Sequence, residues 1–474
     1  MISRLERGCF ASLVALLIWL PIPLGSNRIW AWTIGEVWIA ITAFVLAWVL
    51  YKDGGTNKNR ESISIQQLKA FRWLITPVAV FQIWVFIQII PLPISVLEWI
   101  SPTSASAYQN VAAKWGYISL DPAATYIALI KGIAYLFFIC CSAILIHSKK
   151  RLKTVMLAIV ISGTLQALYA SVNVLLGVES SWIFSLPETD IATGSFVYKN
   201  HLANYLLLCL SMGIGLIVID LSNSQERLSS WQEWVNEVLQ LLVSKKMLVR
   251  FALIIMVIAL VMTRSRMGNS AFFVATFVTG GIAWLCYKQR PPKLTWLLIS
   301  LFIIDIVILG SFFGLEKVQE RIVESHLRSD TRLLVVEWSI PMMKDFLLTG
   351  SGLGSFYIVF PSYTQQAIGY YDHAHNEYVQ FVAEAGLPAT LMLGGMLLWA
   401  FGLSIWVMSN RNSQTCKGAA FGGLIALCAM LIHIWVDFNL QAPANTVTFL
   451  TILVLIGASY SLPSPRRHKV ATHV

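Results

Sequence analysis

The sequence predicts an all-α polytopic membrane protein, and three observations predict it: the composition, the length of the apolar runs and the placement of the basic residues. The chain has 474 residues, of which 57% are hydrophobic and 12% are charged. Soluble globular domains carry roughly twice that share of charged residues, so this class is excluded. The fold class is therefore a bundle of about 12 transmembrane helices with one large outer loop.

Apolar runs of membrane-spanning length recur along the chain. A helix crosses a bilayer with about 20 apolar residues, and runs of this kind lie at residues 9–24, 32–51, 72–91, 123–147, 152–176, 200–221, 248–264, 267–287, 294–313, 387–409, 417–436 and 444–460. The first run has the charged start of a signal peptide. No small-x-small cleavage site precedes Pro21, so we expect a retained first helix.

Basic residues set the predicted orientation. With the N-terminus inside, most of the 34 lysines and arginines fall in cytoplasmic segments, which places both termini in the cytoplasm. This bias, together with contact to anionic membrane lipids, accounts for the net charge of +10, so no nucleic acid partner is expected. All seven cysteines fall in spans or cytoplasmic segments, where we expect no disulfide.

Three regions follow from this topology. Residues 1–313 form an N-terminal transmembrane bundle, residues 314–386 a large outer loop, and residues 387–474 the last transmembrane helices and a cytoplasmic tail. Within the first region, residues 222–247 repeat tryptophan and leucine near helical spacing, which indicates a helix on the cytoplasmic surface. The outer loop is interrupted by capping residues and apolar runs, so we expect a small helical cap.

The most polar stretch of the chain, residues 370–388, lies at the end of this loop. It carries His373 and His375, and an amphipathic run after Asn376 stops at Gly386, which predicts a short helix with a defined end. His375 would lie at the helix N-terminus, where the helix dipole favours neutral imidazole over imidazolium. A neutral histidine there can take a proton.

Arginines stand out on the outer side, where positive charge is otherwise sparse. Arg264 ends the seventh span, Arg266 follows it, and Arg332 lies in the predicted first turn of a cap helix. Snorkelling at the interface is one interpretation. Binding of an anionic ligand is the other, because a guanidinium offers several donors in one plane and stays charged.

Polar residues also gather at the outer ends of two spans. Lys199, Asn200 and His201 mark the mouth of the sixth span, and Asp437 lies in the last outer turn. For Lys199, interfacial anchoring is the alternative to ligand binding.

Two charges fall inside predicted spans. Lys131 lies in the fourth span, where outward snorkelling would explain it, and Asp305 lies deep in the ninth, where it needs a partner or a cavity. The glycine-rich residues 348–357 permit tight turns but are a weak signal for phosphate binding, because no strand precedes them.

Taken together and in order, these motifs resemble those of the O-antigen ligase and polymerase family of bacterial inner-membrane glycosyltransferases. The matching segments are residues 194–203, 263–268, Arg332 with Trp338, residues 350–356, 374–386 and 436–445. The ligases carry His, then Asn, Ser or Gln, nine further residues, Gly, two residues, and Gly or Thr. His375, Asn376 and Gly386 match this pattern, whereas Ala389 departs from it at the last position.

The resemblance implies a GT-C-like fold and a metal-independent, inverting glycosyltransferase without a nucleotide cofactor. Its donor would be an undecaprenyl-pyrophosphate-linked glycan and its acceptor a hydroxyl of a lipid, glycan or protein, met on the periplasmic side of the inner membrane. His375 would be the base, and Arg266 and Arg332 would act with it on the diphosphate. Arg264 and Lys199 would add positive charge, with Arg266 favoured over Arg264 because a glycine-containing pair follows it. Supporting residues would be Asn376, Asn200, His201 and Asp437.

Other functions remain open at this point. A repeat-unit polymerase and a protein O-oligosaccharyltransferase belong to the same family. A small-anion transporter would use Lys131, Asp305 and the outer arginines as an ion path. A metal site would use ligands from Asp372, His373, His375 and Glu377.

Overall fold

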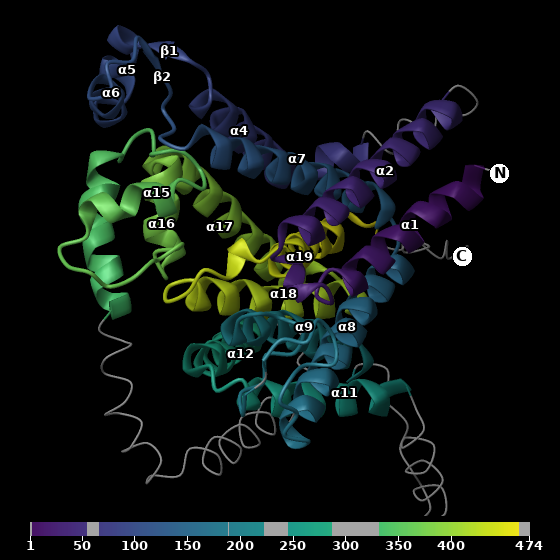
Figure 1. Cartoon of the computed structure of the whole chain (residues 1–474). Coiled ribbons are helices and arrows are strands. Elements are labelled where there is room, and N and C mark those ends of the chain that lie inside the picture. The colour runs from purple at the N-terminus through teal and green to yellow at the C-terminus, as the bar shows by residue number, and fades with distance from the viewer. Residues whose placement is uncertain (1, 55–65, 188, 222–244, 287–330, 464–474) are drawn as a thin grey trace, which may run out of the picture.

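The computed structural model describes residues 2–54, 66–187, 189–221, 245–286 and 331–463, and these residues are mainly helical (Figure 1). Eight of the described helices are long and apolar enough to cross a membrane, judged by length and composition. They are α2 (Ile29–Gly54), α7 (Pro122–Leu145), α8 (Lys149–Leu175), α9 (Lys199–Leu221), α12 (Arg266–Cys286), α17 (Leu387–Asn410), α18 (Gln414–His433) and α19 (Pro443–Ser461). The prediction of an all-α polytopic membrane protein is therefore confirmed.

The remaining predicted spans have different outcomes. Three of them correspond to the helices α1 (Ile2–Trp19), α4 (Arg72–Gln88) and α11 (Lys245–Met262), of which α4 and the apolar part of α11 are shorter than the eight. The predicted span at 294–313, Asp305 within it, and most of the predicted surface helix at 222–247 lie outside the described residues.

Helix α9 is the centre of the bundle. It is buried along its whole span, and it packs along much of its length against α18, with α8, α11 and α19 around it. Glycines allow the close crossing with α18, because a Cβ atom at Gly215 would lie 2.6 Å from the carbonyl oxygen of Gly418. This crossing brings the beginning of α9 beside the end of α18.

Short elements cover one end of the bundle, on the left in Figure 1. After α4, a two-stranded antiparallel pair, β1 (Leu92–Pro93) and β2 (Trp115–Gly116), encloses α5 (Ile94–Ile100) and α6 (Pro102–Gln109). Two single-turn 3-10 helices, η1 (Leu24–Ser26) and η3 (Asn439–Gln441), lie between consecutive long helices. The segments that join these helix ends contact one another, because Leu120 N–H donates to Ser351 O and Glu377 N–H to Ile434 O.

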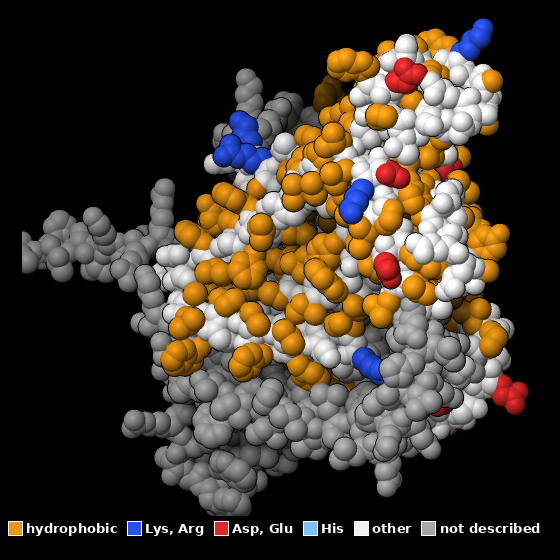
Figure 2. Space-filling model, turned by 90° about the vertical axis from the view of Figure 1, so that its left-hand side faces the viewer, with side chains coloured by type: hydrophobic (Ala, Val, Ile, Leu, Met, Phe, Trp, Pro, Cys, Tyr) orange, Lys and Arg blue, Asp and Glu red, His pale blue; other side chains and the backbone are white. Residues whose placement is uncertain are grey.

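The described part of the outer loop forms a helical cap with its own apolar core. It contains a helix over residues 331–345, then α15 (Phe356–Val359), η2 (Phe360–Tyr363) and α16 (Glu377–Ala385). Trp338, Met342, Phe346, Phe356 and Phe360 fill this small core. Figure 2 looks onto the cap side of the molecule, and apolar side chains cover much of the described surface there.

The glycine-rich segment fastens the cap to the bundle. Gly350, Gly352 and Gly354 have φ angles of 73°, 106° and 87°, which confirms the predicted tight turns. The Gln88 side chain at the end of α4 donates to the carbonyl oxygens of Thr349 and Glu384, each at 2.9 Å. This segment is therefore a packing joint between α4 and α16.

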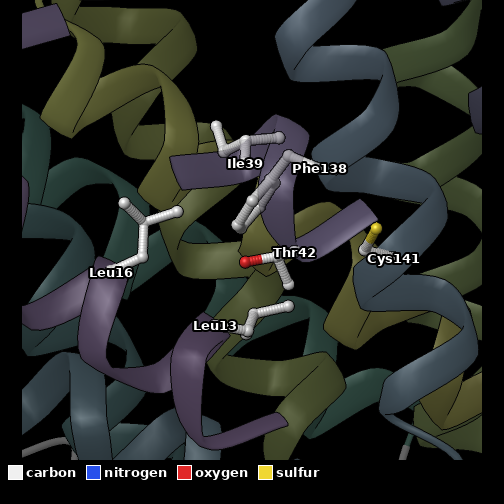
Figure 3. Close-up of a pocket in the computed structure, with 6 residues that line it drawn as sticks. All are labelled: Leu13, Leu16, Ile39, Thr42, Phe138 and Cys141. Carbon is white, nitrogen blue, oxygen red and sulfur yellow. The ribbon is translucent and has the colours of Figure 1, made fainter. Parts of the chain in front are cut away.

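A small pocket and a cation–π contact lie among the bundle helices, apart from the cap. A small pocket between α1, α2 and α7 is apolar apart from the Thr42 hydroxyl and the Cys141 thiol (Figure 3). Lys131 of α7 holds its ammonium nitrogen 4.0 Å from the centre of the Trp32 ring on α2. Trp32 lies in the first turn of α2, so the half-buried Lys131 side chain ends in a cation–π contact near the beginning of that helix.

Candidate functional site

His375 lies immediately before α16, in a strained backbone conformation. Asn376 is the N-cap of the helix, because its side chain accepts the N–H of Val379 at 3.2 Å, and Gly386 with φ of 84° ends it. The predicted helix and both of its ends are therefore confirmed. His375 itself has φ of 53°, a left-handed conformation that costs a non-glycine residue about 1–3 kcal/mol and is common at functional sites.

The imidazole of His375 faces a buried carboxylate. Its Nδ1 lies 3.7 Å from Oδ1 of Asp437, whose side chain is 1% exposed. Burial raises the pKa of Asp437, but the imidazoles of His375, His433 and His201 together lower it by more. The pKa of Asp437 therefore lies below its ordinary value. Asp437 is therefore ionised at neutral pH and favours a proton on Nδ1 of His375, which leaves Nε2 free to accept another.

A chain of hydrogen bonds connects Asp437 to the cap. Asn200, at the start of α9, donates from Nδ2 to Oδ2 of Asp437 and, at 2.8 Å, to the hydroxyl oxygen of Tyr198. Arg332 of the cap helix donates to the same hydroxyl oxygen at 2.9 Å. Burial and the nearby Asp437 charge raise the pKa of Tyr198, so it stays a neutral phenol. The guanidinium of Arg332 is thus positioned through two side chains relative to His375.

Phe438 packs the aromatic side chains of the site together. Its ring stacks on Tyr198 with centres 5.5 Å apart and on His373 with centres 4.5 Å apart. The rings of His375 and His201 meet it edge to face, at 4.9 and 5.0 Å. Phe438 therefore holds three histidines from two distant segments in fixed orientations.

Hydrogen bonding separates the two neighbouring histidines. Gln380 accepts the N–H of Ala374 with Oε1, so its Nε2 faces Nδ1 of His373 at 3.1 Å and donates to it. Nδ1 of His373 is then an acceptor, and the ring proton lies on Nε2. Burial also lowers the pKa of His373 to about 4. Nδ1 of His373 is thus occupied by Gln380, whereas Nδ1 of His375 faces Asp437.

The basic residues predicted for the site are divided by the structure. Arg264, with φ of 50°, forms an ion pair with Asp190 in which Nη1 lies 2.7 Å from Oδ2. Arg266 is exposed at the first residue of α12. The third residue of that helix, Gly268, packs on Ala203 near the start of α9, where Lys199 is half-buried. Arg332 is joined to the His375 network by its hydrogen bond to Tyr198.

The alternative metal site is not assembled. Across the described residues, no group of three or more His, Cys, Asp or Glu side chains is placed to hold a metal ion. Glu377 is fully buried, and its Oε1 accepts the N–H of Leu440 at 2.9 Å. Burial raises the pKa of Glu377 well above its ordinary value, so it is a neutral hydrogen-bonding group. Asp372 is exposed.

Three residues of the site were not predicted individually. Tyr198 and Phe438 adjoin Lys199 and Asp437 in the sequence, and Gln380 lies one helical turn after Asn376. Tyr198 and Phe438 belong to the site because they stack on each other, although they are more than 200 residues apart in the sequence. The sequence signal that could have indicated them is their position, because each is a polar or aromatic residue close to a predicted site residue.

Comparison with protein families adds an independent finding. Residues 251–394 match the family model described as O-antigen ligase. The match includes Arg264, Arg266, Arg332 and His375, and it ends before Asp437. The resemblance to the O-antigen ligase and polymerase family is confirmed over this domain, which supports an O-antigen ligase-like glycosyltransferase activity. A comparison with curated proteins finds no match.

Proposed function

We propose that the protein transfers a glycan from an undecaprenyl-pyrophosphate-type lipid donor to an acceptor hydroxyl on the periplasmic face of a bacterial inner membrane. The observation that carries this proposal is the pairing of His375 with buried Asp437, linked through Asn200 and Tyr198 to Arg332. A base and a diphosphate-binding cation are thereby held at one end of a membrane bundle.

His375 acts as the general base. Its Nε2 removes the proton of the acceptor hydroxyl as the oxygen attacks the anomeric carbon, and Asp437 stabilises the imidazolium that forms. General base catalysis of this kind contributes roughly 10²–10⁴-fold to a rate. The strained backbone at His375 and the contact with Phe438 fix the direction of the ring.

Arginines bind the leaving group. The bond between the anomeric carbon and the diphosphate oxygen breaks as the new glycosidic bond forms, and the diphosphate keeps the electron pair. Attack from the side opposite the leaving group inverts the anomeric centre. Arg332 and Arg266 stabilise the developing negative charge, because a guanidinium binds phosphate oxygens in a bidentate manner. Lys199 adds positive charge nearby, whereas Arg264 acts through its ion pair with Asp190.

The orientation supports a periplasmic reaction. The positive-inside rule places both termini in the cytoplasm, and the cap, His375 and Asp437 all lie at the opposite ends of the helices. A lipid-linked donor presents its diphosphate at the membrane surface, which is where this orientation would put His375 and Arg332.

A deletion strain tests the function. We expect loss of the protein to leave lipid-linked glycan untransferred. The change in surface glycans or in modified protein then identifies the branch of the family. Loss of long surface chains on a lipid core indicates a ligase, chains of a single repeat indicate a polymerase, and unmodified protein indicates a protein O-oligosaccharyltransferase.

Complementation then tests the site. His375→Ala should insert normally and restore no transfer, whereas His147→Ala should restore it, because His147 is paired with Glu6 at the other end of the bundle. Normal transfer by His375→Ala would refute the assignment of the base.

A further inference from the structure

The cap carries two exposed tyrosine rings close to the segment that leads to His375. Tyr357 of α15 is 45% exposed and Tyr370 is 82% exposed. Their ring centres lie 5.9 Å apart, with an angle of 30° between the ring planes. Both rings stay open to the outside although they contact each other, so the pair forms one shallow aromatic surface, which we call the tyrosine platform.

The cap core fixes the position of Tyr357. The preceding residue, Phe356, is fully buried and stacks on Phe360 with ring centres 4.8 Å apart. The backbone N–H of Phe356 also donates to Oε1 of Glu384 at 3.0 Å, which ties α15 to α16 within the cap (Figure 1). Tyr357 is therefore held on a well-anchored turn, with its ring at the surface of the cap.

Tyr371 connects the platform to the proposed base. Its ring packs against the cap core and meets the His375 imidazole edge to face, with ring centres 5.8 Å apart. Tyr370 is the preceding residue, and consecutive Cα atoms are about 3.8 Å apart. A sugar chain whose reacting end lies at His375 therefore needs only a few sugar units to reach the platform.

The place of the platform points away from membrane lipid as its partner. Exposed aromatic rings such as Phe44 of α2 and Trp399 of α17 lie within membrane-spanning helices, where lipid chains cover them. Tyr357 and Tyr370 lie instead in the cap, between the helix over residues 331–345 and α16, and belong to none of the eight long apolar helices. Their partner is therefore a molecule that the cap meets outside the hydrocarbon layer.

Tyrosine rings suit a carbohydrate partner. A sugar ring has faces of C–H bonds, whose hydrogens carry partial positive charge and are attracted by the negative face of an aromatic ring. The phenol hydroxyl can also exchange hydrogen bonds with sugar hydroxyls. Tyrosine has only two side-chain torsions to order, so binding costs little conformational entropy.

The local charge favours the sugars of the substrate over its diphosphate. Asp372, two residues after Tyr370, is exposed. Its carboxylate repels phosphate groups that approach the platform, because like charges in contact are unfavourable. A diphosphate is better matched by the guanidinium of Arg332, which leaves the platform to the glycan.

We propose that Tyr357 and Tyr370 bind the sugar chain of a substrate by stacking on it, a few sugar units away from the bond that forms at His375. This inference rests on the proposed function and deepens it, because it names the residues that hold the glycan. The chain belongs to the lipid-linked donor or to a glycan acceptor, which kinetics with each substrate varied in turn distinguish. Contacts so far from the reacting bond are equal in the ground state and the transition state, so they act on KM.

The first experiment measures the transfer kinetics of Tyr357→Ala, Tyr370→Ala and Tyr370→Phe. Purified full-length protein is assayed with lipid-linked donor and with acceptor extracted from the deletion strain. We expect each Ala variant to raise KM for one of the two substrates about fivefold at unchanged kcat. Tyr370→Phe keeps the ring face and should stay within about twofold of wild type. Tyr51→Ala is the matched control, because Tyr51 is also 82% exposed but lies near the last residue of α2, and it should behave as wild type.

The second experiment detects binding without turnover. Mild acid releases a free oligosaccharide from the lipid-linked glycan of the deletion strain, and this oligosaccharide is added to detergent-solubilised His375→Ala protein. In saturation-transfer NMR, irradiation of the aromatic protons of the protein should pass signal to the C–H protons of the sugars. We expect this signal to be largely lost when Tyr357→Ala and Tyr370→Ala are added to the same protein.

Four outcomes would overturn the platform. They are wild-type KM values for both substrates in the Ala variants, an unchanged NMR signal, a defect of Tyr370→Phe as large as that of Tyr370→Ala, and a lower kcat at unchanged KM, which shows a packing role next to His375. If Tyr370→Ala does not fold, Tyr357→Ala decides. The base assignment stands through all of these as long as His375→Ala is inactive, whereas transfer by His375→Ala refutes the proposed function itself.

Discussion

Replacement of Asp437 by Asn removes the charge that stabilises protonated His375 while nearly preserving side-chain shape. The two groups lie 3.7 Å apart, and at an effective dielectric constant of about 20 a unit charge pair at this separation is worth about 4 kcal/mol. Since each 1.36 kcal/mol changes a rate tenfold, we expect transfer to fall about a thousandfold. The neutral amide also no longer favours the His375 tautomer with a proton on Nδ1.

The assay for Asp437→Asn is the initial rate of glycan transfer with lipid-linked donor in excess. Asp372→Asn is the matched control, because Asp372 is an exposed carboxylate close to His375 in the sequence. We expect this control to stay within about twofold of wild type, as is usual for surface substitutions of small effect. If Asp437→Asn retains more than a tenth of the wild-type rate while His375→Ala is inactive, the carboxylate does not stabilise the base and the reasoning is refuted.

Three further predictions concern the arginines and the cap. Arg332→Lys should recover little of the activity lost in Arg332→Ala, because an ammonium cannot replace the planar donors; transfer rates at varied donor concentration check this. If Arg264 acts through its ion pair with Asp190, the transfer activity lost in Arg264→Asp should be restored by adding Asp190→Arg, whereas the activity lost in Arg266→Asp should not. Transfer rates of each double variant are compared with those of its single variants. Burial raises the pKa of Glu384 to about 7, so the folded state binds more protons than the unfolded state between the ordinary glutamate pKa and about 7. Stability should therefore fall by about 3 kcal/mol as pH rises through this range, and thermal unfolding of Glu384→Gln should show a flatter pH dependence.

The membrane helices were predictable because a span must be apolar along its whole length. α16 was predictable for a different reason, since Asn376 and Gly386 have local roles as a cap and a left-handed stop. Each of these features is determined by neighbouring residues. The same holds for the turns at Gly350, Gly352 and Gly354, although not for their packing against Gln88 and α16.

The connections within the site were less predictable, because they join distant segments. The sequence pointed to Arg332 and His375 separately, but the link through Tyr198 and Asn200 depends on how α9 packs beside the cap. The ion pair of Arg264 likewise involves Asp190, a residue in a different loop that gave no signal of its own.

The path from Arg332 to His375 has a consequence for when the base is ready. Arg332 belongs to the cap, whereas Asn200 and Asp437 belong to the ends of the bundle helices, so the path is continuous only while the cap is docked. Removal of the cap would leave the Tyr198 hydroxyl with a single donor and would loosen the side chain that holds Asn200 against Asp437. Binding of the donor diphosphate by Arg332 would then act on the same connection that orients His375. Under the proposed function, we therefore expect His375 to be oriented for proton removal only when Arg332 holds the donor diphosphate.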